Sequence, residues 1–205
     1  MPAIRSIWLR CFWSIFEMRC LLSLVMVSVL CCSGISLVAQ EKGSEKKAVA
    51  EVVKWGGGKF ALTAPETWKS VPPKSRMIDS EFRVPAEGDL FVRVTFSVSG
   101  GSIKENIDRW VNQFDGVKPE DTKTEKKEIG KATVHIVEVA GTYKDMAGGP
   151  MAPGPMKKLP DYRLLGAIIE LADGTKGFVK ATGPKDMVLA NRDVFMKMLD
   201  GFKAN

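Results

Sequence analysis

Apolar side chains recur at helical spacing in residues 102–115, which is the best-specified element of the sequence. They fall at i, i+4, i+7, i+8 and i+11, on one face of a helix: Ile103, Ile107, Trp110, Val111 and Phe114. Ser102 and Glu105 match the S-x-x-E capping box, in which each side chain bonds the backbone N–H of the other residue. A helix this one-sided needs a sheet to cover, and we expect it to pack across one.

Short stretches with alternating or continuous apolar residues predict strands on both sides of this helix. The predicted strands cover residues 52–62, which three glycines interrupt, 76–84, 89–99, 125–129, 132–142, 162–171 and 176–182. Residues 162–171 are apolar on both faces in their middle, which is typical of a central strand covered on two sides. Asp173 and Gly174 follow and predict a tight turn into the next strand.

Residues 184–203 predict a second helix, which Pro184 opens and which has an apolar face of methionine, valine, leucine and phenylalanine. Tight turns join adjacent strands, so the sheet is expected to be mostly antiparallel. The order strands, helix, strands, helix therefore predicts an α+β fold. We expect a single α/β sandwich in which amphipathic helices at about 102–115 and 184–203 cover the sheet.

Residues 1–39 differ in kind from the rest of the chain. Three arginines precede a nearly uncharged apolar run, which ends before a polar stretch; this is the pattern of a signal peptide, with Met18 as a possible true start. Because the run approaches the roughly 20 residues that span a bilayer, a membrane anchor at residues 20–39 is the alternative. We interpret 40–49 as a flexible tether and 50–205 as one domain, exported to the periplasm or secreted.

The composition of the predicted domain excludes several functions. All four cysteines lie in residues 1–39, which removes a cysteine nucleophile, a thiol redox centre and a cysteine-rich zinc site. Without that segment the net charge falls from +6 to +4, and lysines alternate with acids, as at 125–128. Nucleic-acid binding requires a one-sided basic face with interleaved aromatic residues. We therefore expect no nucleic-acid partner and no cofactor, and membrane contact only through an uncleaved N-terminal segment.

His135 is the only histidine and stands between apolar residues of a predicted strand. A general base is conceivable there, but its own face offers only Thr133, Val137 and Val139, and Glu138 points to the opposite face. We interpret His135 as an ordinary residue of the sheet. The sequence has no motif that pairs a nucleophile with a base, and no phosphate-binding loop.

Four cations stand among apolar neighbours: Arg93, Arg109, Arg163 and Lys180. They could converge on an anionic ligand beside Tyr143 or Tyr162. Such residues more often pair with nearby acids, and Asp108 and Glu138 are candidates for that role. Ion pairing is therefore the interpretation that we adopt.

Residues 144–160 have no periodicity and contain four prolines, so they predict a loop. A loop of this length in a compact domain is usually functional or disordered. We predict that the main contact surface lies here and is formed by Tyr143, Met146, Met151, Met156, Tyr162 and Arg163. The thioethers of the three methionines could bind Cu(I), but no cysteine or histidine accompanies them, so we interpret them as gap-filling residues of a surface loop.

Several motifs resemble known families. The P-x-x-W turn from Pro65 to Trp68, with the order of elements, resembles the PsbP-like superfamily over roughly residues 50–203. That group includes extrinsic lumenal proteins of photosystem II and a nuclear-import factor that binds the Ran GTPase, so the resemblance implies a binding role. Four blocks resemble an uncharacterised family of exported bacterial proteins, notably from planctomycetes: N-x-x-R-W-x-x-Q-F from Asn106, G-T-Y from Gly141, Y-R-L-L-G-A-I-I-E from Tyr162 and F-V-K-A-T-G-P from Phe178. Neither resemblance carries over a functional residue.

Two functional classes follow. The first is an exported, non-catalytic binding or accessory protein of the cell envelope, which contacts an unknown envelope protein or a small ligand through residues 144–160. The second is a hydrolase or ligand-processing enzyme with a carboxylate-based site. The absence of thiols from the predicted domain and its single histidine favour the first.

Overall fold

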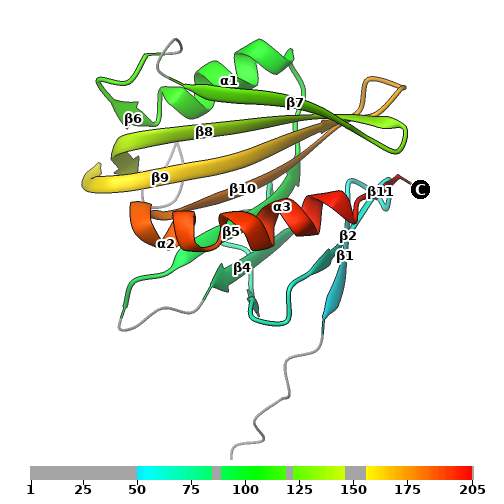
Figure 1. Cartoon of the computed structure of the whole chain (residues 1–205), viewed down its shortest axis with the longest axis horizontal. Coiled ribbons are helices and arrows are strands. Elements are labelled where there is room, and N and C mark those ends of the chain that lie inside the picture. The colour runs from blue at the N-terminus through cyan, green and yellow to red at the C-terminus, as the bar shows by residue number, and fades with distance from the viewer. Residues whose placement is uncertain (1–49, 85–88, 119–121, 146–155, 205) are drawn as a thin grey trace, which may run out of the picture. The chain divides into compact units, whose positions relative to one another are not determined.

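Strands far apart in the sequence join into one antiparallel sheet of order β3-β4-β5-β10-β9-β8-β6, and β7 pairs with β8 outside this path. The computed structural model describes residues 50–84, 89–118, 122–145 and 156–204 (Figure 1). The strands of this sheet are β3 (Lys69–Val71), β4 (Ser80–Val84), β5 (Val92–Val98), β6 (Phe114–Asp115), β7 (Lys123–Ile129), β8 (Ala132–Asp145), β9 (Lys157–Glu170) and β10 (Lys176–Pro184).

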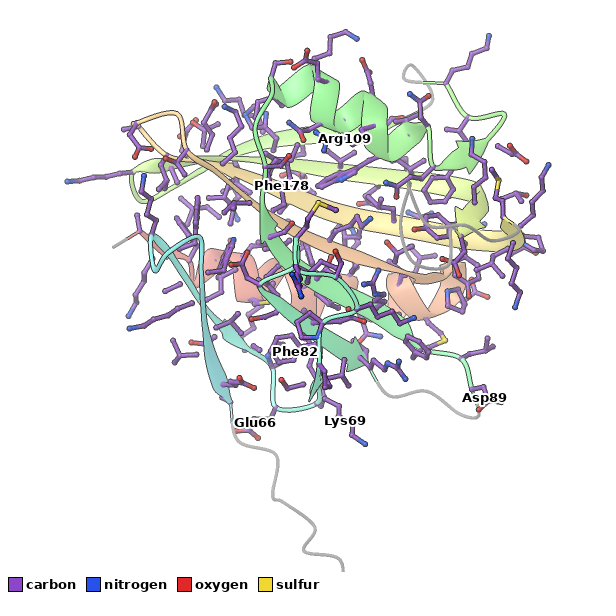
Figure 2. The ribbon with its side chains drawn as sticks, turned by 180° about the vertical axis from the view of Figure 1, so that it is seen from behind. Glu66, Lys69, Phe82, Asp89, Arg109 and Phe178 are labelled. Carbon is purple, nitrogen blue, oxygen red and sulfur yellow. The ribbon has the colours of Figure 1, made fainter. Side chains whose placement is uncertain are left out.

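A smaller sheet of order β1-β2-β11 brings the two ends of the described chain together. Its strands are β1 (Glu51–Trp55), β2 (Phe60–Ala64) and β11 (Lys203–Ala204). The described helices are α1 (Ile103–Val111), α2 (Lys185–Ala190) and α3 (Arg192–Asp200). Figures 1 and 2 show α1 on one side of the large sheet and α2 with α3 on the other.

Each face of the large sheet has its own hydrophobic core. On one face, the buried side chains of α2, α3 and the small sheet pack against alternate residues of the strands, with Trp55, Phe195 and Leu199 at most 1% exposed. On the other face, Trp110 and Val111 of α1 pack against a second cluster. Strands β9 and β10 contribute to both cores, so the predicted two-sided cover is confirmed. The structure is the α+β sandwich that the sequence predicts.

The capping box of α1 forms as predicted. The hydroxyl of Ser102 accepts a hydrogen bond from the Glu105 N–H, and the Glu105 carboxylate accepts one from the Ser102 N–H. The predicted end of the helix at residue 115 is wrong, because the helix stops at Val111 and Phe114 pairs with Tyr143 as part of β6. The spacing of Phe114 fits the apolar face of a helix. Its backbone is nevertheless extended, because it pairs with β8, which is distant in the sequence.

The predicted helix over residues 184–203 is also wrong in detail. Pro184 stands at the N-cap of α2 as expected, but the helix breaks at Asn191, and its second part, α3, ends at Asp200, before β11. The side-chain amide of Asn191 donates a hydrogen bond to the Met187 carbonyl, 2.8 Å away. Asparagine readily makes such local side-chain bonds, which compete with helix continuation.

The loop predicted for residues 144–160 is shorter than expected, because both of its ends are strand. Lys144 pairs with Lys158 and Asp145 pairs with Lys157, which extends β8 and β9 beyond their predicted limits. A register shift follows Gly141, and Asp161 opposite it has a positive φ of 54°. Proline has no N–H to donate to a neighbouring strand, so it is found in strands only at bulges or edges. The irregularity therefore explains how β9 accommodates Pro160.

Several predicted features lie outside the described residues. These are the predicted signal peptide at 1–39, the predicted tether at 40–49 and most of the predicted loop at 146–155. The N-terminal features therefore remain predictions.

Candidate functional site

A strip of polar side chains lies on the α1 face of the large sheet, and we name Arg93, Arg109 and Lys180 the cationic strip. Lys180 of β10 pairs with Thr95 of β5, and Thr182 pairs with Arg93, so these residues share one face. The intervening residues Val179 and Ala181 lie in the core on the other face. Figure 2 shows Arg109 and Phe178 on the side of the sheet that carries α1. Trp110 and Phe178 meet there edge to face, with ring centroids 6.0 Å apart.

Arg93 is neutralised by Glu81 of β4. Its Nε and Nη2 atoms donate hydrogen bonds of 2.8 and 2.7 Å to the two carboxylate oxygens of Glu81, which is only 1% exposed. Burial raises the pKa of Glu81, but the hydrogen bonds from Arg93 and from the Lys74 N–H together outweigh it, and the net shift is downward. Glu81 is therefore ionised and serves as the fixed counter-ion of Arg93.

Lys180 has no acidic partner among the described residues. Its Nζ atom donates a hydrogen bond of 3.2 Å to the neutral Oε1 of Gln113, just after α1. Burial, together with the positive charges of Arg93 and Arg109, lowers the pKa of Lys180 to about 8. A cation held in this way lacks the pairing that normally offsets its desolvation.

Arg109 is held by neutral groups as well. Its guanidinium donates hydrogen bonds to Asn106 Oδ1 and to Ser99 Oγ. Asn106 is 1% exposed and donates in turn to the carbonyls of Gly100 and Ser102, which fixes its orientation. The buried amide thus positions a guanidinium that makes no ion pair with any described residue. The cationic strip consequently carries two charges that Glu81 does not neutralise.

A buried hydroxyl accompanies these cations. Thr182 follows Lys180 by two residues on the same face of β10 and is 8% exposed. Its Oγ1 atom is buried and has no hydrogen-bond partner within the described part of the chain. Buried polar groups nearly always have a partner in folded proteins, so this hydroxyl is an exception that requires an explanation.

The two tyrosines predicted for the contact surface lie at one end of the same face. The rings of Tyr143 and Tyr162 stack with centroids 6.0 Å apart and an interplanar angle of 10°, and Phe114 packs against Tyr143 at 5.3 Å. Burial raises the pKa of Tyr143, with a further rise from Asp145, whereas the charge of Arg93 opposes it. Because the charge of Arg93 acts on Tyr143, the strip and the tyrosine pair are electrostatic neighbours.

The other predicted contact residues do not all join this pair. Met156 is exposed just before β9, while Met146 and Met151 lie outside the described residues. Arg163 points to the opposite face, where it donates a 2.6 Å hydrogen bond to Glu138. Glu138 also accepts from Arg192 at the start of α3. Glu138, one of the two acids expected to pair with the cations, thus binds Arg163 and separates it from the tyrosines.

His135 has an acidic neighbour that the sequence did not reveal. Its Nε2 atom lies 3.9 Å from a carboxylate oxygen of Glu170, which comes from β9, and the other oxygen of Glu170 lies 3.3 Å from Lys176 Nζ. Burial lowers the pKa of His135, so the imidazole is predominantly neutral. The sequence of β8 alone indicates Glu138 as the nearest carboxylate. Glu170 comes near His135 only because β9 pairs with β8.

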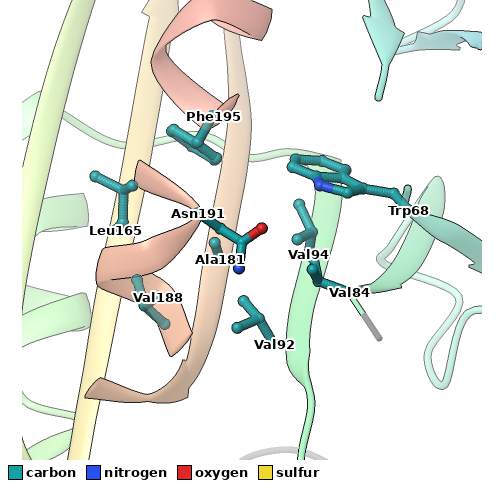
Figure 3. Close-up of a pocket in the computed structure, with 9 residues that line it drawn as sticks. All are labelled: Trp68, Val84, Val92, Val94, Leu165, Ala181, Val188, Asn191 and Phe195. Atoms are coloured by element: carbon teal, nitrogen blue, oxygen red, sulfur yellow. The ribbon is translucent and has the colours of Figure 1, made fainter. Parts of the chain in front are cut away.

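A small apolar cavity lies on the opposite face, between the α2–α3 junction and the sheet (Figure 3). Its volume is about 10 Å³, which is room for at most one water molecule. Its lining includes Trp68, Val92, Asn191 and Phe195. A space of this size does not hold a substrate, so the strip and the tyrosine pair are the better candidate site.

The described residues offer neither a metal site nor a membrane-spanning helix. No group of three or more histidine, cysteine, aspartate or glutamate residues is arranged to hold a metal ion. Within the same residues, no helix is both long and apolar enough to cross a membrane.

The fold defines an α+β sandwich with helices on both faces of an antiparallel sheet. Neither the scan of protein-family models nor the search of curated proteins finds a match. Among solved structures, the chain is similar to cyanobacterial PsbP (CyanoP) from Synechocystis sp. PCC 6803, with 13% identity, a TM-score of 0.49 and coverage of 80% of this chain and 96% of that one. It is also similar to the Saccharomyces cerevisiae Ran-binding protein Mog1p, with 11% identity, a TM-score of 0.43 and coverage of 77% and 96%. We carry over no residue role or activity from either protein.

Proposed function

We propose that this chain is a non-catalytic binding protein of the cell envelope, exported by residues 1–39, and that its contact surface is centred on the tyrosine pair. One observation carries the proposal: Tyr143 and Tyr162 stack where β8 and β9 extend past the end of β10. The surface comprises these two tyrosines and Met156.

The length of the β8–β9 hairpin supports this proposal. Strand β10 ends at Pro184, which pairs with Tyr162, so residues 157–159 of β9 pair only with β8 among the described residues. This end of β9 carries Lys157, Lys158 and Pro160, which are residues that prevent uncontrolled pairing with other strands. Side chains, and not the strand edge, are therefore the expected recognition elements.

The character of the exposed side chains also supports a contact role. Tyrosine is enriched at protein interfaces because it combines a large apolar ring with a polar end and few rotatable bonds. The tyrosine rings are half-buried, which leaves area available to a partner, and Met156, just before β9, is 50% exposed. Tyr143 and Tyr162 are also the only tyrosines of the chain.

The placement of the carboxylates favours binding over a carboxylate-based hydrolase. Such a hydrolase needs two carboxyl groups that face a substrate at a defined separation. Glu81 binds Arg93, Glu138 binds two arginines, and Glu170 lies beside Lys176 and His135. These three carboxylates of the described sheet therefore form ion pairs within the protein and do not face a substrate together.

Affinity capture from an envelope extract tests the proposal. Met156→Glu places a charge on the proposed surface, and Leu189→Glu on α2, where Leu189 is 40% exposed, provides a matched control elsewhere. We expect the wild type and Leu189→Glu to retain the same partner and Met156→Glu to lose it. If both variants retain the partner equally, the contact surface lies elsewhere. Turnover of a pooled substrate panel by the purified chain would instead favour the enzyme.

A further inference from the structure

We propose that the apolar cavity between the α2–α3 junction and the large sheet binds a single water molecule, which bridges the indole of Trp68 and the side-chain amide of Asn191. The water accepts a hydrogen bond from Trp68 Nε1 and donates one to Asn191 Oδ1. This site goes beyond the proposed function, because it lies in the core on the face of the sheet opposite the tyrosine pair and does not depend on any partner bound there.

The size of the cavity is the first argument. Its volume of about 10 Å³ corresponds to about one water-sized sphere, so it admits one water molecule and nothing larger. Most of its lining consists of buried valine, leucine, alanine and phenylalanine side chains, which cannot form hydrogen bonds. Cavities that stay empty in proteins are apolar, whereas buried waters occupy cavities that offer polar partners. The polar atoms that face this cavity therefore decide whether water enters it.

The hydrogen-bond donor is the second argument. Trp68 is 6% exposed, and its Nε1 atom is buried without a hydrogen-bond partner in the described part of the chain. Figure 3 shows the indole nitrogen directed into the cavity, on the side that faces Asn191. An indole has one polar group, which only donates, and this group normally finds a partner when it is buried. A water in the cavity supplies the acceptor that the surrounding side chains do not.

The hydrogen-bond acceptor is the third argument. Asn191 is the C-cap of α2 and the N-cap of α3, and its Nδ2 atom donates a 2.8 Å hydrogen bond to the Met187 carbonyl. Because a carbonyl oxygen needs a donor, this bond fixes which end of the amide is the oxygen. No hydrogen bond within the described residues uses Oδ1, and Figure 3 shows it turned toward Trp68. The water thus has two partners, and buried waters make roughly two to four hydrogen bonds.

The water joins two segments that are distant in the sequence. Trp68 closes the turn that begins at Pro65, and its backbone nitrogen lies 3.0 Å from the Pro65 carbonyl oxygen. Asn191 marks the break between α2 and α3. Without the water, the indole N–H would be a buried donor without a partner, which is unfavourable. The water therefore helps to hold the helix break against the Trp68 turn.

Rotating-frame NMR of the full chain, with isotope-labelled tryptophan, tests the site. A bound water gives a direct cross-relaxation peak to the Trp68 indole proton, and the sign of this peak is opposite to that of a peak produced by hydrogen exchange. Trp55 is the control in the same sample, because its Nε1 atom is also buried without a partner in the described residues but Trp55 does not line the cavity. We expect a direct water peak at Trp68 and none at Trp55. Trp68→Phe and Trp55→Phe assign the two indole signals.

Asn191→Leu replaces the acceptor by an apolar side chain of similar size. Asn112→Leu is the matched control, because Asn112 is exposed and lies at the end of α1, away from the cavity. We expect Asn191→Leu to lose the direct water peak at Trp68 and Asn112→Leu to retain it. Where Asn191→Leu does not fold, the comparison of the two wild-type indoles still tests the site.

Three results would overturn the proposal. The first is a Trp68 indole with no direct water peak, or with an exchange peak alone, which would mean that the cavity is dry between transient openings. The second is equal direct peaks at Trp68 and Trp55, which would indicate general penetration of the core by water. The third is a direct peak at Trp68 that persists in folded Asn191→Leu.

Discussion

Strand register decides whether the charge of Lys180 has an acidic partner. In the sequence it is one of four cations among apolar neighbours, and all four were expected to be paired with acids. Arg93 and Arg163 are paired, with Glu81 and Glu138. Lys180 and Arg109 bond only neutral groups among the described residues. The difference could not be predicted, because it depends on which strands pair and on where α1 ends.

The depressed pKa of Lys180 predicts a pH dependence of stability. In the unfolded chain this amine has its ordinary pKa, so between pH 8 and about 10.5 the unfolded state binds more protons. Stability attributable to Lys180 therefore rises with pH through this window and is lost as pH falls to 8. Allowing for partial exposure of the side chain, the effect is about 2 kcal/mol.

Urea unfolding at pH 8.0 and pH 9.5 measures this effect. We expect the difference in unfolding free energy between Lys180→Met and the wild type to be larger at the lower pH, with the variant more stable. The raised pKa values of Tyr143 and Tyr162 affect both proteins equally, so the comparison cancels them. A difference that does not change with pH would show that Lys180 titrates normally.

Helix α1 shows which part of an element a local pattern determines. Its start was predicted correctly, because the capping box involves residues three apart in the chain. Its end was predicted incorrectly, because Phe114 pairs with Tyr143, which is 29 residues away in the sequence. The same limit applies to the predicted loop over residues 144–160, where prolines indicated a loop but long-range pairing made both ends strand.

The docking of α1 depends on a close contact between Trp110 and Gly166. A Cβ atom on Gly166 would lie 2.4 Å from the Trp110 ring, so a side chain and the indole cannot occupy this position together. Trp110→Ala should cost about 3–5 kcal/mol of unfolding free energy. Gly166→Ala should also destabilise the protein, but it should cost less in the Trp110→Ala background, because the clash is then absent.

A double-mutant cycle by urea unfolding tests this coupling. Gly100→Ala serves as the control, since open space surrounds that glycine and its φ is not positive. Additive effects of the Trp110 and Gly166 substitutions would mean that α1 does not pack on β9 in this way.

In the described structure as a whole, the large sheet separates two hydrophobic cores, and different elements cover each of them. The larger core lies under α2, α3 and the small sheet, and the smaller one lies under α1. The two-sided apolar pattern of residues 162–171 was sufficient to predict this arrangement. The contents of the candidate site were less predictable, because its residues come from β5, α1, β8, β9 and β10 and meet only in the folded chain.

The two faces also differ in their polar contacts. On the face with α2 and α3, Glu138 joins Arg163 of β9 and Arg192 of α3 in one network. On the face with α1, Arg93 binds Glu81, whereas Arg109 and Lys180 hydrogen-bond neutral groups. This asymmetry is why we place recognition on the α1 face and regard the other face as structural.

Site-specific photo-crosslinking in cells that express the chain tests this placement most directly. A photo-reactive phenylalanine analogue replaces Tyr162 in one protein and Leu189, which is exposed on α2, in another. We predict a discrete crosslinked partner from position 162 and none from position 189. A discrete partner from position 189, with none from position 162, would contradict the account.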